Sequence, residues 1–172
     1  MRGFLLLILT ALSFCSIADT RSNASIFVNH ERNNSDQITT VGVSHIFSRS
    51  SNGFVGEVNT ALGYAEVLTE SGFMEEYPVW ETGIKFGYYS TAFIYIEAGL
   101  DLAELTLNSE REACCIRDEQ VNNQIDGYAG IGTGVNVENV RLTLFVRARQ
   151  IDANTWESKE QVFTGVNFEL TF

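Results

Sequence analysis

The sequence has no apolar stretch long enough to cross a membrane as a helix. Its clearest apolar run, near the start of the chain at residues 4–9, is far shorter than the roughly 20 residues that a membrane-spanning helix needs. A helical membrane protein is therefore excluded. Positive charge is also scarce, because 11 Lys and Arg stand against 22 Asp and Glu. Nucleic acid binding depends on basic side chains, so we expect no nucleic-acid partner.

Cysteine is nearly absent as well. Cys15 falls in the leader described below, and the other two, Cys114 and Cys115, are adjacent in a charged stretch. Neighbouring cysteines cannot join distant parts of a fold. A vicinal disulfide, an intermolecular bond and two free thiols all remain open. The carboxylates around them are poor partners for a thiolate-bound metal, and we expect neither a metal nor a cofactor.

Proline occurs once, at Pro78, whereas there are 14 glycines and 12% aromatic residues. This composition favours sheets with tight turns over helices. The chain opens with Arg2, a short apolar run and small residues at Ser16 and Ala18. That order is typical of a secretory signal peptide over residues 1–18, cleaved after Ala18. Residues 19–172 then have the length of one domain.

The main signal in the mature chain is an alternation of apolar and polar residues. Residues 140–148 carry Val, Leu, Leu, Val and Ala at even positions, while three arginines lie among the odd positions from 141 to 149. An alternation of period two is typical of a strand. Eight such strands are predicted, over residues 25–31, 38–48, 54–64, 79–89, 92–102, 125–136, 139–151 and 162–172.

The predicted connections alternate in length. Three are short, at residues 49–53, 90–91 and 137–138, and the other four are longer and polar, at residues 32–37, 69–77, 108–122 and 152–160. Short turns at one rim and long loops at the other are typical of outer-membrane barrels. The fold class predicted is therefore all-β, an eight-stranded antiparallel up-and-down transmembrane β-barrel.

A soluble barrel with an apolar interior is the structural alternative, and the composition of the two faces argues against it. The polar faces combine glycine with ten charged side chains that could pair inside a narrow barrel: Glu57, Glu81, Lys85, Glu97, Asp101, Asp126, Arg141, Arg147, Arg149 and Glu169. The apolar faces begin and end in aromatic residues, Phe54 with Tyr64 and Trp80 with Tyr88. Their spacing fits the apolar band between the aromatic girdles of a membrane barrel.

The chain stops on Phe172, preceded at alternate positions by Leu170, Phe168, Val166 and Thr164. This strand resembles the C-terminal signal of bacterial outer-membrane barrels, which implies recognition by the barrel-assembly machinery. The whole mature chain resembles the small barrels typified by outer-membrane protein X and by the membrane domain of outer-membrane protein A. The resemblance implies an outer-membrane location, with outer-membrane lipid and lipopolysaccharide as surroundings. No motif specific to that family is present.

Catalytic chemistry has few candidates. Some eight-stranded barrels act on lipid A with a His, a Ser and a carboxylate near the outer rim. His30 lies near Glu31, Ser35 and Asp36 in the sequence, and His45 is predicted toward the periplasmic half of its strand. Nothing in the spacing predicts the contact between nucleophile and base that such chemistry needs, so we assign no catalytic residue.

The long loops are acidic, and they carry Glu70, Glu75, Glu76, Glu110, Glu112, Asp118, Glu119, Asp152, Glu157 and Glu160. A charge run is most often a solvated loop, but these loops could also meet an extracellular ligand. Three functions stay open: a non-enzymatic surface or envelope-structural barrel, which we favour, a narrow channel, and a lipid A-modifying enzyme.

Overall fold

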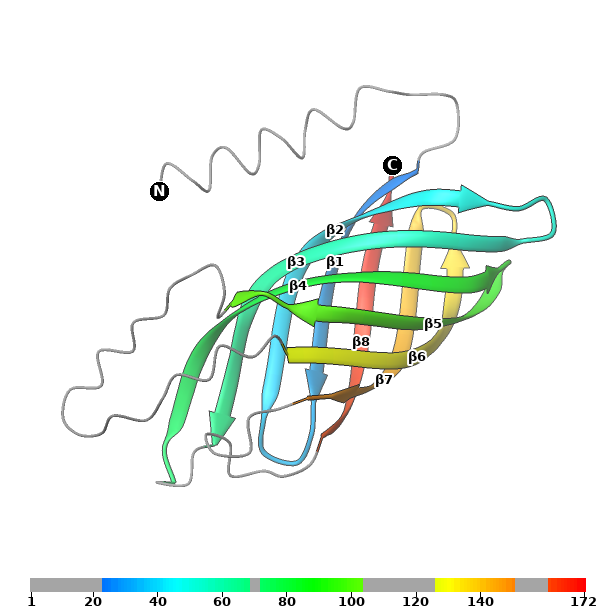
Figure 1. Ribbon diagram of the computed structural model, residues 1–172. Helices are drawn as coiled ribbons and strands as arrows, with labels where there is room; N and C mark the ends of the chain where they lie inside the picture. Colours follow the sequence, from blue (N-terminus) through cyan, green and yellow to red (C-terminus); the bar gives the residue numbers. More distant parts are fainter. Residues whose placement is uncertain (1–22, 69–71, 104–125, 151–160) are drawn as a thin grey trace.

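The computed structural model describes residues 23–68, 72–103, 126–150 and 161–172. It contains eight strands, drawn as arrows in Figure 1. Their bounds are β1 Ala24–Arg32, β2 Gln37–Arg49, β3 Phe54–Leu68, β4 Met74–Tyr89, β5 Ala92–Asp101, β6 Asp126–Val137, β7 Val140–Arg149 and β8 Val162–Thr171. No helix among the described residues is long and apolar enough to span a membrane.

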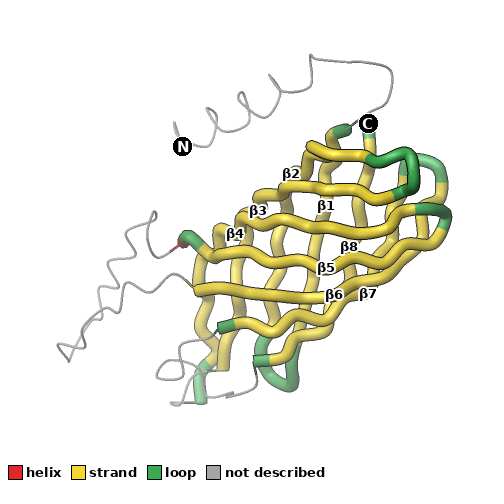
Figure 2. The backbone as a smooth tube through the Cα atoms, turned by 45° about the vertical axis from the view of Figure 1, so that its right-hand side comes forward, coloured by secondary structure: helices red, strands yellow, loops and turns green. Residues whose placement is uncertain are grey.

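Each strand pairs antiparallel with the next one in the sequence, and β1 also pairs with β8, so that the sheet closes into a barrel. The tube in Figure 2 follows this up-and-down path around the wall. Closure leaves no unpaired edge strand of the kind that invites aggregation. The predicted eight-stranded antiparallel barrel is confirmed.

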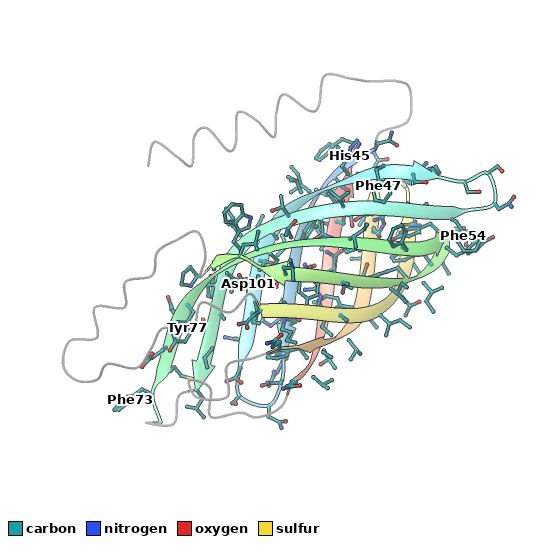
Figure 3. The ribbon with its side chains drawn as sticks, in the orientation of Figure 1. His45, Phe47, Phe54, Phe73, Tyr77 and Asp101 are labelled. Atoms are coloured by element: carbon teal, nitrogen blue, oxygen red, sulfur yellow. The ribbon has the colours of Figure 1, made fainter. Side chains whose placement is uncertain are left out.

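The two ends of the barrel differ as predicted. The connections at residues 50–53, 90–91 and 138–139 all lie at one end, which we call the turn end, and Phe172 N donates to Ala24 O there. At the opposite loop end, residues 33–36 join β1 to β2, and the Asn33 side chain accepts hydrogen bonds from the backbone N–H groups of Ser35 and Asp36. Figure 3 labels His45 and Phe54 toward the turn end and Phe73 and Asp101 toward the loop end.

The stagger of the pairing sets the tilt of the strands. Hydrogen-bonded partners can be followed once around the wall, from Ser48 through Gly56, Phe86, Ile96, Ile131, Val146, Thr164 and Arg32 to Gln37. The path returns to β2 about ten residues nearer the loop end, once the bulge between Ile46 and Ser48 is set aside. Such a stagger corresponds to strands tilted by about 40° and to an interior just wide enough for side chains.

The predicted faces are confirmed along the strands. In β7, Arg141, Thr143, Phe145, Arg147 and Arg149 are buried, and the residues that alternate with them, at 142, 144, 146 and 148, are exposed. The polar and charged side chains therefore point into the lumen, whereas the aliphatic side chains cover the outside.

Two predicted boundaries were wrong, because β3 runs on to Leu68 and β4 already begins at Met74. Residues 74–77, predicted as loop, pair in register with 65–68 and so include Glu75 and Glu76 in a strand. Pro78 lies within this part of β4. The ladder between β4 and β5 ends at Glu81 and Asp101, so at Pro78 the described part of β4 pairs with β3 alone. An edge position of this kind tolerates the missing N–H of proline.

The predicted signal peptide at residues 1–18 lies outside the described residues, and so do Cys114 and Cys115. Most of the acidic residues assigned to the long loops also fall in segments that the structure does not describe.

Candidate functional site

The lumen holds two clusters of ionised side chains, and the larger lies toward the loop end. Arg147, which is 1% exposed, is its centre. Its Nε and Nη2 donate to the two oxygens of Glu97 at 2.7 and 3.0 Å, and its Nη1 reaches Glu31 at 3.2 Å and Glu81 at 3.4 Å. Arg149 also donates to Glu31 and Glu81. Two guanidinium groups thus bridge three carboxylates that come from β1, β4 and β5.

The second cluster lies toward the turn end. Arg141 Nη1 donates to Glu57 at 3.0 Å and to Glu169 at 2.9 Å, and the ammonium of Lys85 lies 3.9 Å from Glu57. Ser25 adds a hydrogen bond to Glu169. This cluster is balanced, with two acids and two bases. Buried charges are tolerated in proteins when they are paired and hydrogen-bonded in this way.

Aromatic rings fill the space between and around the clusters. The guanidinium of Arg147 lies 4.5 Å from the ring centroids of both Tyr128 and Phe145. The Lys85 ammonium lies 5.3 Å from the rings of Phe27 and Tyr95. At these distances the rings attract the cations as well as excluding water from them.

Inward glycines make room for these rings. A Cβ added to Gly99 would lie 2.3 Å from the Tyr128 ring, one on Gly132 would lie 2.4 Å from the Tyr95 ring, and one on Gly165 would lie 2.4 Å from that of Phe145. Real Cβ contacts are not so short. The glycine-rich inner face predicted from the sequence is therefore the complement of the aromatic residues that fill the lumen.

The loop end of the lumen is apolar. Ile38, Ala65, Val67, Val79 and Phe163 are all buried there and form one cluster, against which Tyr77 packs. The described interior thus contains ion pairs along the axis and an apolar cluster between them and the loop end.

The predicted charge network is confirmed in its main members and was incomplete in one. Glu57, Glu81, Glu97 and Glu169 all make ion pairs. Glu31, which is next to His30 in the sequence, is the member that sequence reasoning missed, although it alternates with Phe27 and Asn29 on the same inward face of β1. That parity was the signal that could have identified it.

The two predicted aspartates lie at the end of the network rather than within it. Asp101 is half-buried, and its Oδ1 accepts hydrogen bonds from Trp80 N at 3.0 Å and Ala103 N at 2.9 Å. It therefore stabilises the backbone where β5 ends. Asp126 is half-buried opposite Asp101 in the register of β5 and β6.

The histidine region does not assemble a nucleophile and a base. His30 points outward, where its Nδ1 lies 3.0 Å from Thr39 Oγ1, whereas Glu31 points into the lumen. The nearby Asp36 accepts hydrogen bonds from Ser35 Oγ at 3.3 Å and Leu68 N at 3.0 Å. His45 is exposed on the outside, toward the turn end. Among the described residues, no group of three or more His, Cys, Asp or Glu could hold a metal ion.

The outer wall is a broad apolar surface. Leu144 is 64% exposed, Ile96 61% and Ile94 53%, and apolar residues are exposed on all eight strands. A water-soluble protein rarely exposes a continuous apolar patch larger than a few hundred Å². Outward hydroxyls are satisfied locally: Thr60, Thr82 and Thr133 each donate to a backbone carbonyl of a neighbouring strand, at 3.1, 3.3 and 2.8 Å.

Aromatic residues mark both edges of this surface on β3 and β4. At a tilt of about 40° each residue advances about 2.5 Å along the barrel axis. Phe54 and Tyr64 on β3 are then separated by roughly 25 Å along the axis, and Trp80 and Tyr88 on β4 by roughly 20 Å. The apolar band of a membrane barrel is about 25 Å tall between its aromatic girdles.

Comparison with known proteins gives a likeness of fold. No protein-family model matches the chain, and no curated protein matches it. A chain from the de novo design of transmembrane β-barrels superposes with a TM-score of 0.54 at 12% identity, over 91% of this chain and 100% of its own. The outer membrane enzyme PagL superposes with a TM-score of 0.48 at 12% identity, over 87% of this chain and 99% of its own. The first likeness supports the barrel fold alone, the second adds nothing to it, and the resemblance to outer-membrane protein X stays a prediction.

Proposed function

We propose that this chain is an integral protein of a bacterial outer membrane whose barrel does not conduct and whose outer loops carry its specific interactions. The observation that carries the proposal is the inside-out arrangement of the barrel. Ionised side chains pair within the lumen, and aliphatic side chains cover the outside. A wall of this kind is solvated by lipid and not by water.

The orientation follows from the two ends. Outer-membrane barrels place their short turns in the periplasm and their long loops outside the cell. The turn end, with Phe172, is accordingly the periplasmic rim. Phe172 is exposed beside Ala24, where the barrel closes. A terminal strand that ends in an exposed Phe suits the role we propose for it, recognition by the barrel-assembly machinery.

The filled lumen supports a barrel that does not conduct. An ion moving along the axis would have to pass the Arg141 cluster, the Arg147 cluster and the apolar cluster around Phe163. Separating a buried ion pair costs about 3–5 kcal/mol, because it leaves an uncompensated charge. The contacts thus favour a rigid frame over the narrow channel.

The histidine geometry favours a non-enzymatic role. A nucleophile and its base need contact at about 3 Å, together with a third group that orients the base. His30 and Glu31 lie on opposite faces of β1, and His30 has Thr39 as its partner. The specific function is therefore proposed to lie in the acidic outer loops, which would meet an extracellular ligand or support the envelope.

Conductance in planar lipid bilayers tests the sealed lumen. The full mature chain should insert without steady ionic current, while heat-modifiable gel mobility shows that it is folded in the membrane. A matched variant, Arg147→Ala with Glu97→Ala, removes the central pair and should raise the current above that of the wild type. Steady current through the wild-type barrel would overturn the sealed-lumen proposal.

Exchange of the loops tests their role. Residues 104–125 are replaced by a short turn between β5 and β6, and the other loops are retained. We expect unchanged insertion and heat-modifiable mobility, because the strand pairing of the wall is retained, and a loss of the extracellular binding that this loop carries. If all binding by the wild type survives the replacement of each outer loop in turn, the loops do not carry the interaction.

A further inference from the structure

A shallow apolar groove runs down the outside of the barrel beneath the outer end of β1. The part nearer the outer rim has a volume of about 630 Å³ and is lined by His30 and Arg32 of β1 together with residues of β5 to β8, most of which point outward. Below it lies a second hollow of about 720 Å³, which shares His30, Leu144 and Val166 with the first. The two hollows together form a furrow along the outside of the wall, which runs from Arg32 near the outer rim to Ala92 beside the turn at residues 90–91.

The floor of the furrow is aliphatic. Ile131, Leu144, Val146 and Val166 are all half or nearly half exposed. The outer ends of β3 and β4, by contrast, carry Tyr64 and Trp80. Narrow flexible hydrocarbon chains fit a furrow of branched aliphatic side chains, whereas a protein partner is usually met by aromatic residues.

A cation lies at the head of the furrow. Arg32 is exposed at the last position of β1, and the Thr164 hydroxyl donates to its backbone carbonyl at 3.5 Å. Arg32 pairs with Gln37 of β2, and Gln37 pairs with Glu66 of β3. Because the strands are tilted, each of these partners lies nearer the loop end than the one before it. Arg32 is therefore at about the height of Tyr64, where lipid headgroups meet the barrel.

The charge of Arg32 is available to a ligand. The other described cations toward this end, Arg147 and Arg149, are buried in ion pairs inside the lumen. None of the carboxylates in the described part of the chain makes an ion pair with Arg32. His30 lies two residues before Arg32 on the same face of β1 and is half-buried beside Thr39. Its imidazole lines the same hollow.

We propose that this furrow binds lipid A, with a phosphate held by Arg32 and His30 and an acyl chain in the aliphatic groove below. The inference rests on the proposed outer-membrane location, because lipid A occupies the outer leaflet that Arg32 faces. Guanidinium groups recognise phosphate through paired hydrogen bonds. The chain as a whole carries a formal charge of −11, so an exposed basic side chain at this rim is unusual in this sequence. Its positive charge suits an anionic lipid.

The test is native mass spectrometry of the folded full mature chain in detergent, titrated with diphosphorylated lipid A. Arg32→Gln should weaken binding about tenfold, the factor that corresponds to about 1.4 kcal/mol, and His30→Phe should weaken it by a smaller factor. Arg49→Gln is the matched control, because Arg49 is an exposed arginine at the opposite rim; its affinity should equal that of the wild type. Equal weakening by Arg32→Gln and Arg49→Gln would overturn the proposal.

Two further lipids separate the possible sources of the phosphate. Lipid A stripped of both phosphates should bind weakly and equally to the wild type and to Arg32→Gln. Phosphatidylglycerol should bind less tightly than lipid A, because it has one phosphate and fewer chains; equal affinity for the two lipids would show a general anionic-lipid site and overturn the assignment to lipid A. Heat-modifiable mobility of every variant is measured in parallel. A barrel that fails to insert would refute the membrane location itself, whereas a folded barrel that is insensitive to Arg32→Gln refutes only the lipid site.

Discussion

Replacing Arg147 by Met should destabilise the barrel more than an exchange of apolar side chains on its outer wall. The guanidinium of Arg147 bridges Glu97, Glu31 and Glu81, with distances between 2.7 and 3.4 Å. Met retains an apolar stem against the ring of Tyr128 and removes the charge. Glu97 would then lose its ion-pair partner, and Glu31 and Glu81 would share Arg149 alone. Removing one partner from a buried ion pair costs about 3–5 kcal/mol, and we expect a loss of that size in the free energy of unfolding.

The measurement is urea-induced unfolding of the protein in phospholipid vesicles, followed by tryptophan fluorescence and by gel mobility. The substitution Val146→Met on the same strand is the control, because Val146 points outward and one apolar side chain replaces another. This variant should differ from the wild type by less than about 0.5 kcal/mol in the free energy of unfolding. The double variant Arg147→Met with Glu97→Gln restores the charge balance and should recover about 1–3 kcal/mol. If the free energies of unfolding of Arg147→Met and Val146→Met differ by less than about 1 kcal/mol, the ion pairs of Arg147 do not stabilise the barrel.

Three other substitutions test the wall and its turns. Gly132→Ala should cost about 1–3 kcal/mol of unfolding free energy, because the new Cβ would lie 2.4 Å from the Tyr95 ring. Gly127→Ala is the control, because its nearest contact would lie at 3.8 Å, and it should cost less than about 0.5 kcal/mol. Equal losses would contradict the packing argument. Leu144→Arg should cost about 2–4 kcal/mol in vesicles, because Leu144 lies near the middle of the apolar band, and a loss near zero would mean that this face meets water. Glu138→Gly should stabilise the barrel by up to about 1 kcal/mol in the same unfolding assay, because Glu138 has a φ of 53° in the turn between β6 and β7; a destabilised variant would contradict the strain inferred there.

The alternation of side chains made most of this fold predictable. In β7 and β8 mostly apolar residues alternate with mostly polar or small ones, although Phe145 and Phe163 lie on the inward faces, and period two assigns those faces with no knowledge of the partners. Their inward and outward residues were assigned as the structure has them. Alternation cannot reveal which face is inside. The polar face was assigned to the lumen because it combines charged residues with many glycines, a combination that a solvated face does not require.

The boundaries that were missed lie where a tertiary contact overrides a local signal. The acidic pair Glu75 and Glu76 was assigned to a polar loop, but pairing with the long β3 extends β4 to Met74. Glu31 was missed for a related reason. Its neighbours in the sequence, His30 and Asp36, suggested a common site, whereas the pleat of β1 sends His30 outward and Glu31 toward Arg147. Proximity in sequence is a poor guide to proximity in a strand, because successive side chains point to opposite faces.

The geometry of the wall also limits where a specific function can lie. Eight strands tilted by about 40° enclose a space that side chains fill, and here five glutamates, three arginines and one lysine occupy it among aromatic rings. In the sealed lumen that we propose, a substrate or ion would have to break pairs such as Arg147 with Glu97, and each broken pair costs several kcal/mol. On that proposal the surfaces left to bind a ligand are the outer rim and the wall itself. Arg32 stands where those two surfaces meet, and the same pleat that commits Glu31 to the lumen directs the side chain of its neighbour toward the lipid.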